Sequence, residues 1–137
     1  MWSTVIGAAL VVVLLDRWSK ALVRSRPTER WTIAIAPGVS IRHVRAAMRL
    51  HTPLIAAVGL LLTVTLLGAL LATGRVFREP ASWIGIGSAV AGAASNVYDR
   101  MHDRCVVDFV CVGWWPAFNV ADVAIVVGAA TALLSLR

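Results

Sequence analysis

The chain has 137 residues, 59% of them hydrophobic, and carries a formal net charge of +6 at pH 7. This apolar content exceeds the roughly 45–50% typical of soluble domains, which excludes an ordinary soluble protein. The basic residues lie between hydrophobic stretches and form no separate domain, so they argue against nucleic-acid binding and favour contact with the anionic head groups of a lipid bilayer. We therefore expect residues 1–137 to form a single membrane domain.

Four segments are long and apolar enough to cross a bilayer, which requires about 20 mostly apolar residues. We expect transmembrane helices over residues 2–23, 52–72, 81–98 and 117–136. The first lacks the basic start and the small-residue cleavage site of a removable signal, so we expect it to be retained. The second has no ionisable residue and is predicted to have a purely structural role. The third is rich in Gly, Ala and Ser, which allows close helix packing in lipid.

The segments between these helices carry turn and interface signals. Residues 24–51 are polar and basic, and β-branched residues surround a turn signal at Pro37 and Gly38. This pattern predicts a short sheet or hairpin lying on the membrane surface. Residues 105–112 are expected to be extended, and tryptophans follow them, as at a membrane interface. The predicted fold class is all-α and integral to the membrane, with four transmembrane helices and a small membrane-surface β element after the first helix.

Two aspartates stand at the edges of apolar segments, Asp108 in VVDF and Asp122 in FNVAD. A carboxylate inside a bilayer costs roughly 2.5–3.5 kcal/mol on insertion scales, so its presence indicates a function. Two carboxylates at one membrane depth can share a proton and activate a water molecule, which is the chemistry of aspartic proteases. For the two to meet, the chain must fold back at Trp114, Trp115 and Pro116.

In the first predicted helix, Asp16 and Lys20 lie one helical turn apart, so their side chains can meet. They form either a self-neutralised pair that anchors the helix near the interface or a support for an active site.

Further polar residues share helix faces near the two aspartates. Asn96 and Asp99 share one face at the end of the third predicted helix, and Asn119 shares one with Asp122. Both asparagines can donate hydrogen bonds to carboxylates or to substrate carbonyl groups. Asp99 and its neighbour Arg100 form either a structural ion pair, which we favour, or a direct contact with substrate.

The residue types around Asp108 also include zinc ligands, namely Cys105, Cys111 and His102. In an extended strand, however, the spacing of the two cysteines would separate their sulfurs by about 20 Å. We therefore predict unpaired apolar cysteines, no metal and no cofactor.

These motifs resemble the active-site region of the lipoprotein signal peptidase family, also called signal peptidase II. The family pattern of Asn-x-x-Asp-Arg, Val-x-Asp-Phe and Phe-Asn-x-Ala-Asp occurs here in order as NVYDR, VVDF and FNVAD, and LDRWSK resembles its Asp-x-x-Ser-Lys motif. The resemblance implies a four-helix intramembrane aspartic endopeptidase of the bacterial cell (inner) membrane. Such enzymes remove the signal peptide from diacylglyceryl-modified prolipoproteins, just before the lipidated cysteine.

The resemblance also implies roles for individual residues. Asp108 and Asp122 fall on the catalytic pair. The surrounding positions, which bind substrate or support the pair, are Asn96, Asp99, Arg100, Asn119, Asp16 and Lys20. The implied partners are a diacylated prolipoprotein and the lipid bilayer, with the oligomeric state left open.

The chain departs from the family pattern in two places. It has HVRAAMR where the family carries Asn-x-Gly-Ala-Ala, and Arg104 where the family favours Gly, which reaches backbone angles that Arg does not reach cheaply. A catalytically impaired relative that binds membrane lipoproteins is therefore an alternative. A small four-helix proton-coupled transporter is another, although transporter sites tend to lie near the bilayer midplane.

Two criteria disagree about orientation. Cytoplasmic loops are usually rich in Lys and Arg, and residues 24–51 hold more arginines than residues 73–80. That rule alone would turn the Asp108 segment toward the cytoplasm. The resemblance instead implies cytoplasmic termini and an active site near the outer face. We adopt this second orientation because the active-site motifs are more specific than a charge count.

Overall fold

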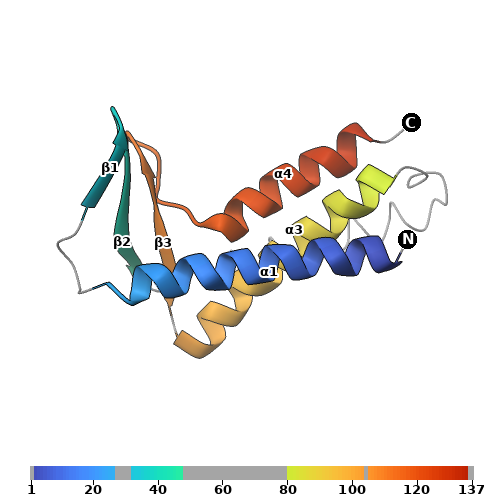
Figure 1. The fold of residues 1–137 in the computed structure, drawn as a ribbon, viewed down its shortest axis with the longest axis horizontal. Coiled ribbons are helices and arrows are strands. Elements are labelled where there is room, and N and C mark those ends of the chain that lie inside the picture. Colours follow the sequence, from blue (N-terminus) through green and yellow to red (C-terminus); the bar gives the residue numbers. More distant parts are fainter. Residues whose placement is uncertain (1, 27–31, 48–79, 104, 136–137) are drawn as a thin grey trace.

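The computed structural model describes residues 2–26, 32–47, 80–103 and 105–135 (Figure 1). In chain order these residues form α1 (Trp2–Arg24), β1 (Thr32–Ala36), β2 (Val39–Ala47), α3 (Pro80–Asp103), β3 (Cys105–Val112) and α4 (Val120–Leu134). The three strands form a sheet at one end of the helices, while α1 begins and α4 ends at the opposite end (Figure 1).

Helices α3 and α4 lie backbone to backbone because glycines face each other across their interface. A Cβ atom at Gly85 would lie 2.5 Å from the carbonyl oxygen of Gly128, and one at Gly128 would lie 2.5 Å from that of Gly85. A Cβ atom at Gly92 would likewise lie 2.5 Å from the carbonyl oxygen of Ala121. Small residues permit this close approach. Gly92 therefore sets the distance between α3 and the first turn of α4.

Helix α1 packs on α3 in a similar way. A Cβ atom at Gly87 would lie 2.6 Å from the carbonyl oxygen of Val5. At its other end, α1 reaches the sheet, where Val23 joins Val107 and Phe109 of β3 in a buried cluster. Burial of such apolar side chains stabilises the fold. This packing fixes β3 against the helix ends.

The sheet has the order β1-β2-β3, with antiparallel neighbours. Strands β1 and β2 form a hairpin whose turn contains Gly38 at φ 76, a left-handed conformation that favours glycine. The backbone N–H of Gly113 donates to the carbonyl of Gly38 at 2.8 Å, which ties the end of β3 to this turn. Strand β2 pairs Val44 with Asp108 after a register shift that begins at Ile41. The sheet thereby presents Asp108 at its junction with the helices.

The predicted helices correspond to observed ones where the structure describes them. Segments 2–23, 81–98 and 117–136 match α1, α3 and α4, although α3 continues to Asp103 and α4 begins at Val120. The longer α3 carries its last turn beyond the predicted apolar boundary because no helix-breaking residue interrupts it.

The sheet is larger than predicted. The hairpin after the first helix is present, and segment 105–112 joins it as β3, so the fold class all-α is too simple. Segment 52–72 lies outside the described residues, and the four-helix arrangement and the single domain over 1–137 stay predictions. Of the helices that the structure describes, none combines the length and the apolar character of a membrane-crossing helix.

Candidate active site

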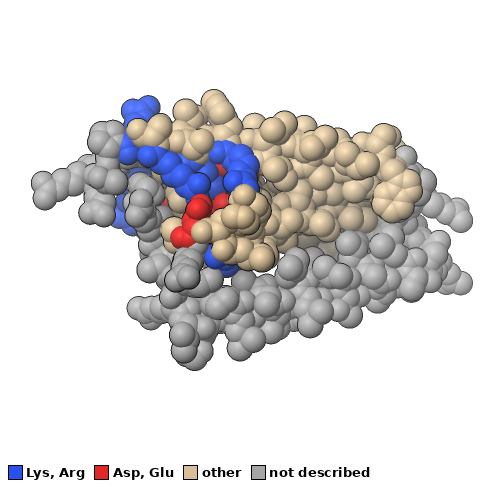
Figure 2. Space-filling view, turned by 90° about the horizontal axis from the view of Figure 1, so that it is seen from below, with Lys and Arg blue, Asp and Glu red and all other residues tan. Residues whose placement is uncertain are grey.

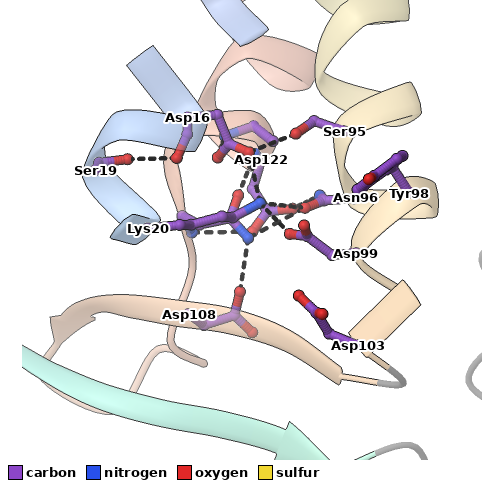
Figure 3. A network of polar contacts seen from close by, with 12 residues as sticks. Asp16, Ser19, Lys20, Ser95, Asn96, Tyr98, Asp99, Asp103, Asp108 and Asp122 are labelled. Atoms are coloured by element: carbon purple, nitrogen blue, oxygen red, sulfur yellow. Dashed lines mark hydrogen bonds and ion pairs between the residues drawn. The ribbon is translucent and has the colours of Figure 1, made fainter. Parts of the chain in front are cut away.

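Lys20 occupies the centre of a buried charge cluster that joins α1 to α3 (Figure 3). Its ammonium nitrogen lies 2.5 Å from Asp16 Oδ2 and 2.6 Å from Asp99 Oδ2. The exposed fractions of Asp16, Lys20 and Asp99 are only 0%, 1% and 0%. Charges buried this deeply are tolerated when they are paired. The single ammonium therefore compensates carboxylates from two helices and fixes their relative position.

The Asp99 carboxylate interacts with Lys20 by charge rather than by an aligned hydrogen bond. Among the described residues, no donor makes a hydrogen bond of acceptable angles to either Asp99 oxygen, despite the short distance to Lys20. The predicted ion pair between Asp99 and Arg100 is wrong, because the cation beside Asp99 is Lys20. Arg100 is half-buried on α3, and its positive charge acts on Asp108 instead.

Asp16 connects α1 to both other helices. Its Oδ2 accepts a hydrogen bond from Ser95 Oγ of α3 at 2.6 Å. Its Oδ1 accepts one from the backbone N–H of Ala121 at 3.0 Å. The first N–H groups of a helix lack hydrogen-bond partners within the helix. Asp16 therefore accepts a hydrogen bond from an N–H group of α4 that would otherwise have no partner. Sequence patterns did not single out Ser95, although it lies four residues before Asp99 on the same helix face.

A reciprocal cap places Asp122 in the first turn of α4. The Asn119 side-chain oxygen accepts a hydrogen bond from the Asp122 backbone N–H, and an Asp122 carboxylate oxygen accepts one from the Asn119 backbone N–H, each at 3.0 Å. This is a capping box, which satisfies two unpaired donors at once. A helix N-terminus also favours a negative charge at this position.

Two asparagine amides link Asp122 to Asp108. Asn119 Nδ2 donates to Asp108 Oδ1 at 2.8 Å and to Asn96 Oδ1 at 3.2 Å. Asn96 Nδ2 in turn donates to Asp122 Oδ1 at 2.7 Å. Asn96 and Asn119 are buried, whereas Asp108 and Asp122 are half-buried. The two half-buried carboxyl groups are therefore linked to each other through two buried asparagine side chains.

The environment changes the acidity of Asp108, which lies on β3 outside the helices. Burial, and then the negative charge of Asp122, raise the pKa of Asp108 from 3.8 to about 6. The hydrogen bond from Asn119 and the positive charges of Lys20 and Arg100 act in the opposite direction but do not outweigh them. A carboxyl group that stays largely protonated up to about pH 6 and lies near a second carboxylate can act as a general acid.

The cysteines near Asp108 have other neighbours. Cys111 is buried, and its Sγ accepts a hydrogen bond from Arg42 Nε at 3.1 Å. Cys105 is half-buried, and both cysteines are free. His102 stacks on the Tyr98 ring with centroids 3.9 Å apart. Within the described ranges, no three His, Cys, Asp or Glu side chains are grouped so as to hold a metal ion.

Two carboxyl groups linked by asparagines, next to a buried charge cluster, form the kind of site that an aspartic peptidase uses. Sequence comparison identifies the family. The profile described as signal peptidase (SPase) II matches residues 8–137, and the chain belongs to this family. It is therefore an aspartic endopeptidase of the signal peptidase II type, as the motifs predicted.

Relatives of similar length support this assignment. The lipoprotein signal peptidase of Nitratidesulfovibrio vulgaris (strain DP4) is 35% identical over 96% of this chain and 88% of its own length. That of Syntrophomonas wolfei is 33% identical over 89% of this chain and 85% of its own. The predicted family and function are thereby confirmed.

Two solved structures share the fold. Both are described as bacterial membrane enzymes, and both align with a TM-score of 0.72 over 96% of this chain. One is 24% identical and covered over 86% of its length, and the other is 22% identical and covered over 91%. At these identities the likeness extends to the fold alone.

Proposed function

We propose that this enzyme crosses the bacterial cell membrane several times and that Asp108 and Asp122 are its catalytic pair. The proposed reaction is hydrolysis of the signal peptide of a diacylglyceryl-modified prolipoprotein, just before the lipidated cysteine. The observation that carries the proposal is the position of Asn119, which donates to Asp108 from its side chain and to Asp122 from its backbone. One residue thus holds both carboxyl groups at one accessible place.

Two such carboxyl groups suffice for peptide hydrolysis. The negative charge of Asp122 opposes the ionisation of Asp108, so the pair can share one proton. The ionised member accepts a proton from water, and the protonated member donates one to the substrate. The buried cluster of Asp16, Lys20 and Asp99 joins α1 to α3, and Asp16 also accepts a hydrogen bond from the backbone of α4, the helix that carries Asp122. Asn96 belongs to the same support, because it donates directly to Asp122.

The distribution of apolar and charged side chains supports a position in a membrane. Large apolar side chains are exposed along α1 and α4, including Leu10, Leu14 and Val126. Exposed apolar surface of this extent is typical of lipid contact. On the face in Figure 2, Lys, Arg and acidic residues gather toward one end, and the rest of the described surface there has no charged side chain. That charged end would lie at the membrane surface.

The active site is proposed to lie near the outer face of the membrane, with both termini in the cytoplasm. Trp114 and Trp115 are exposed in the segment between β3, which carries Asp108, and α4, which carries Asp122. Exposed tryptophans are enriched where lipid meets water. The site therefore belongs at an interface rather than at the bilayer midplane, which disfavours the transporter alternative.

A cleavage assay tests this proposal. The purified chain in detergent micelles is given a diacylglyceryl-modified prolipoprotein and, separately, the same precursor without the lipid. We expect a product that begins at the lipidated cysteine from the first substrate and none from the second. Binding of the acylated precursor without cleavage would instead support the impaired relative. The two departures at HVRAAMR and Arg104, which lie at or beyond the limits of the described side chains, would then be the first positions to restore.

A further inference from the structure

The amide of Asn96 has a fixed orientation because its oxygen faces two donors, Lys20 Nζ and Asn119 Nδ2. The oxygen and nitrogen of an asparagine amide can exchange places by rotation, so their assignment depends on their neighbours. An ammonium group has donors only, so the Asn96 atom that faces Lys20 Nζ at 3.4 Å must be the oxygen. The amide nitrogen therefore points the other way, toward Asp122 Oδ1 at 2.7 Å (Figure 3).

The amide of Asn119 is oriented by the same logic. The backbone N–H of Asp122 can only donate, so it selects the Asn119 oxygen at 3.0 Å. The Asn119 nitrogen is left to face Asp108 Oδ1 and Asn96 Oδ1. Both asparagines consequently present N–H donors, and not oxygens, to the two aspartates. A donor stabilises the ionised form of a carboxyl group.

These donors are distributed unequally between the aspartates. Asp122 receives one on each oxygen, from Asn96 Nδ2 and from the Asn119 backbone, and it lies at the N-terminus of α4. From the described residues, Asp108 receives a single hydrogen bond, on Oδ1. The charges that face Asp108 are Asp122 on α4, Lys20 on α1 and Arg100 on α3, and burial opposes its ionisation most strongly.

We propose that the free enzyme holds the shared proton on Asp108 and that Asp122 is the base that activates water, because Asn96 and Asn119 place two N–H donors on Asp122 and only one on Asp108. This inference rests on the proposed catalytic function of Asp108 and Asp122. It assigns different roles to two residues that the chemistry of a carboxyl pair leaves interchangeable.

The assignment gives a balanced reaction. Asp122 takes a proton from water as the water oxygen bonds to the scissile carbonyl carbon, and Asp108 gives its proton to the carbonyl oxygen. The tetrahedral intermediate then breaks its carbon–nitrogen bond. Asp122 returns its proton to the leaving nitrogen, and Asp108 recovers one from a hydroxyl group of the intermediate. The pair ends in its starting state, with the proton on Asp108.

Carboxyl 13C NMR of aspartate-labelled enzyme in micelles measures the proton position directly. Spectra of the Asp108→Asn and Asp122→Asn variants assign the two signals in the unsubstituted protein. As the pH falls through about 6, we expect the Asp108 signal to move to its protonated position while the Asp122 signal stays at its ionised position. Movement of the Asp122 signal first, or of both signals together, would overturn the assignment. The measurement needs no substrate, so it is independent of whether the chain cleaves prolipoproteins.

Removal of one donor tests the physical cause. Asn96→Leu deletes the donor to Asp122. We therefore expect the proton to reside on Asp122 for part of the time, and the Asp122 signal to shift toward its protonated position. Ser95→Ala is the matched control, because Ser95 donates to Asp16 and not to either member of the pair. If Asn96→Leu titrates like the control, the count of donors does not decide the proton position and the proposal fails.

Discussion

The carboxylate of Asp16 on α1 accepts a hydrogen bond from the backbone N–H of Ala121, at a distance of 3.0 Å, in the first turn of α4. Ala121 is completely buried and directly precedes Asp122. The position of one proposed catalytic carboxyl group therefore depends on a residue in the first helix of the chain. Asp16 acts on α4 through an acceptor oxygen and on Lys20 through its charge, and these two actions can be separated.

We predict that Asp16→Asn lowers cleavage less than Asp16→Ala. Asparagine keeps an oxygen for the Ala121 N–H, while alanine leaves that buried donor without a partner, at a cost of about 1–3 kcal/mol. The measurement is kcat for both variants, with the free energy of unfolding recorded alongside. Equal losses in the two variants would mean that the charge of Asp16, and not its acceptor oxygen, is what matters.

The second prediction concerns the aspartate pair. We expect Asp108→Asn and Asp122→Asn each to abolish signal-peptide release while the protein stays folded, because each variant destroys the acid–base couple. The double variant should lose little more, since groups that act as a unit are not additive. The assay is cleavage of a diacylated prolipoprotein in liposomes.

The control for this pair is Asp103→Asn. Asp103 forms an ion pair with Arg24 in which both side chains are well exposed, and such pairs contribute little to stability. We expect nearly normal turnover from it. Substantial turnover in either Asp108→Asn or Asp122→Asn would show that the pair is not the catalytic site.

The third prediction is that Gly92→Ala inactivates the enzyme although Gly92 has no functional group. The added Cβ would lie 2.5 Å from the carbonyl oxygen of Ala121, so α3 and the first turn of α4 must separate. That movement displaces Asp122 relative to Asn96, and even a small displacement at a catalytic site lowers the reaction rate strongly. The measurement is kcat, for which we expect a loss of about 100-fold.

Gly7→Ala is the matched control, because a Cβ atom at Gly7 on α1 meets nothing within 4 Å. Alanine is also the better helix former by roughly 1 kcal/mol, so this variant should be as stable as the parent or more so. Comparable activity in Gly7→Ala and Gly92→Ala would refute the role assigned to the close helix contact.

The sequence motifs predicted which residues belong to the site, but they did not always predict which of these residues contact each other. The pairing of Asp16 with Lys20 follows from local helix geometry and is present at 2.5 Å. The pairing of Asp99 with Arg100 fails because adjacent residues on a helix point to different faces, and the cation that reaches Asp99 comes from α1. Such contacts depend on packing between helices far apart in the chain, which a local pattern does not contain.

The sheet shows the same limit. The turn signal at Gly38 predicted the hairpin, and the extended segment 105–112 was also expected. Its pairing with β2, including the register shift between Ile41 and Val44, is a non-local property. Because the sequence offers no local signal for that register, the position of Asp108 opposite Val44 could not be predicted.

The fourth prediction follows from the pKa of Asp108, which burial and the charge of Asp122 raise from 3.8 to about 6. The general acid must hold its proton, so kcat/KM should fall as the pH rises through about 6, approaching a tenfold decrease per pH unit. The measurement is the pH profile of kcat/KM, which reports the free enzyme. A profile that instead increases through pH 6 would contradict the raised pKa.

Stability gives an independent measure of the same group. Between pH 3.8 and about 6 the folded chain holds a proton on Asp108 that the unfolded chain has released. The folded state thus binds more protons, and the free energy of unfolding should decrease with rising pH across this window. Asp108→Asn cannot ionise, so its free energy of unfolding should lack this contribution. Identical pH dependence in the two proteins would show that Asp108 is not perturbed.

The fifth prediction is that both termini face the cytoplasm while the Asp108 segment faces outward. A reporter fused after Arg137, active only in the cytoplasm, should therefore be active in intact cells. An impermeant thiol reagent added to the same cells should label the half-buried Cys105, and Cys105→Ala should remove that labelling.

The orientation matters because the basic residues favour the opposite one. Residues 24–51 are rich in arginine, and the positive-inside rule would retain them in the cytoplasm. Exposed Arg42 lies on β2, in the same sheet as Asp108, so an outward site requires this sheet to rest on the outer surface, where Arg42 can meet anionic head groups. If a reporter fused after Arg137 were active only on the outer side of the membrane, the orientation of the enzyme would be the reverse of the one predicted. The aspartates would then face the cytoplasm, away from exported precursors, and the proposed cleavage of prolipoproteins by this chain would have to be abandoned.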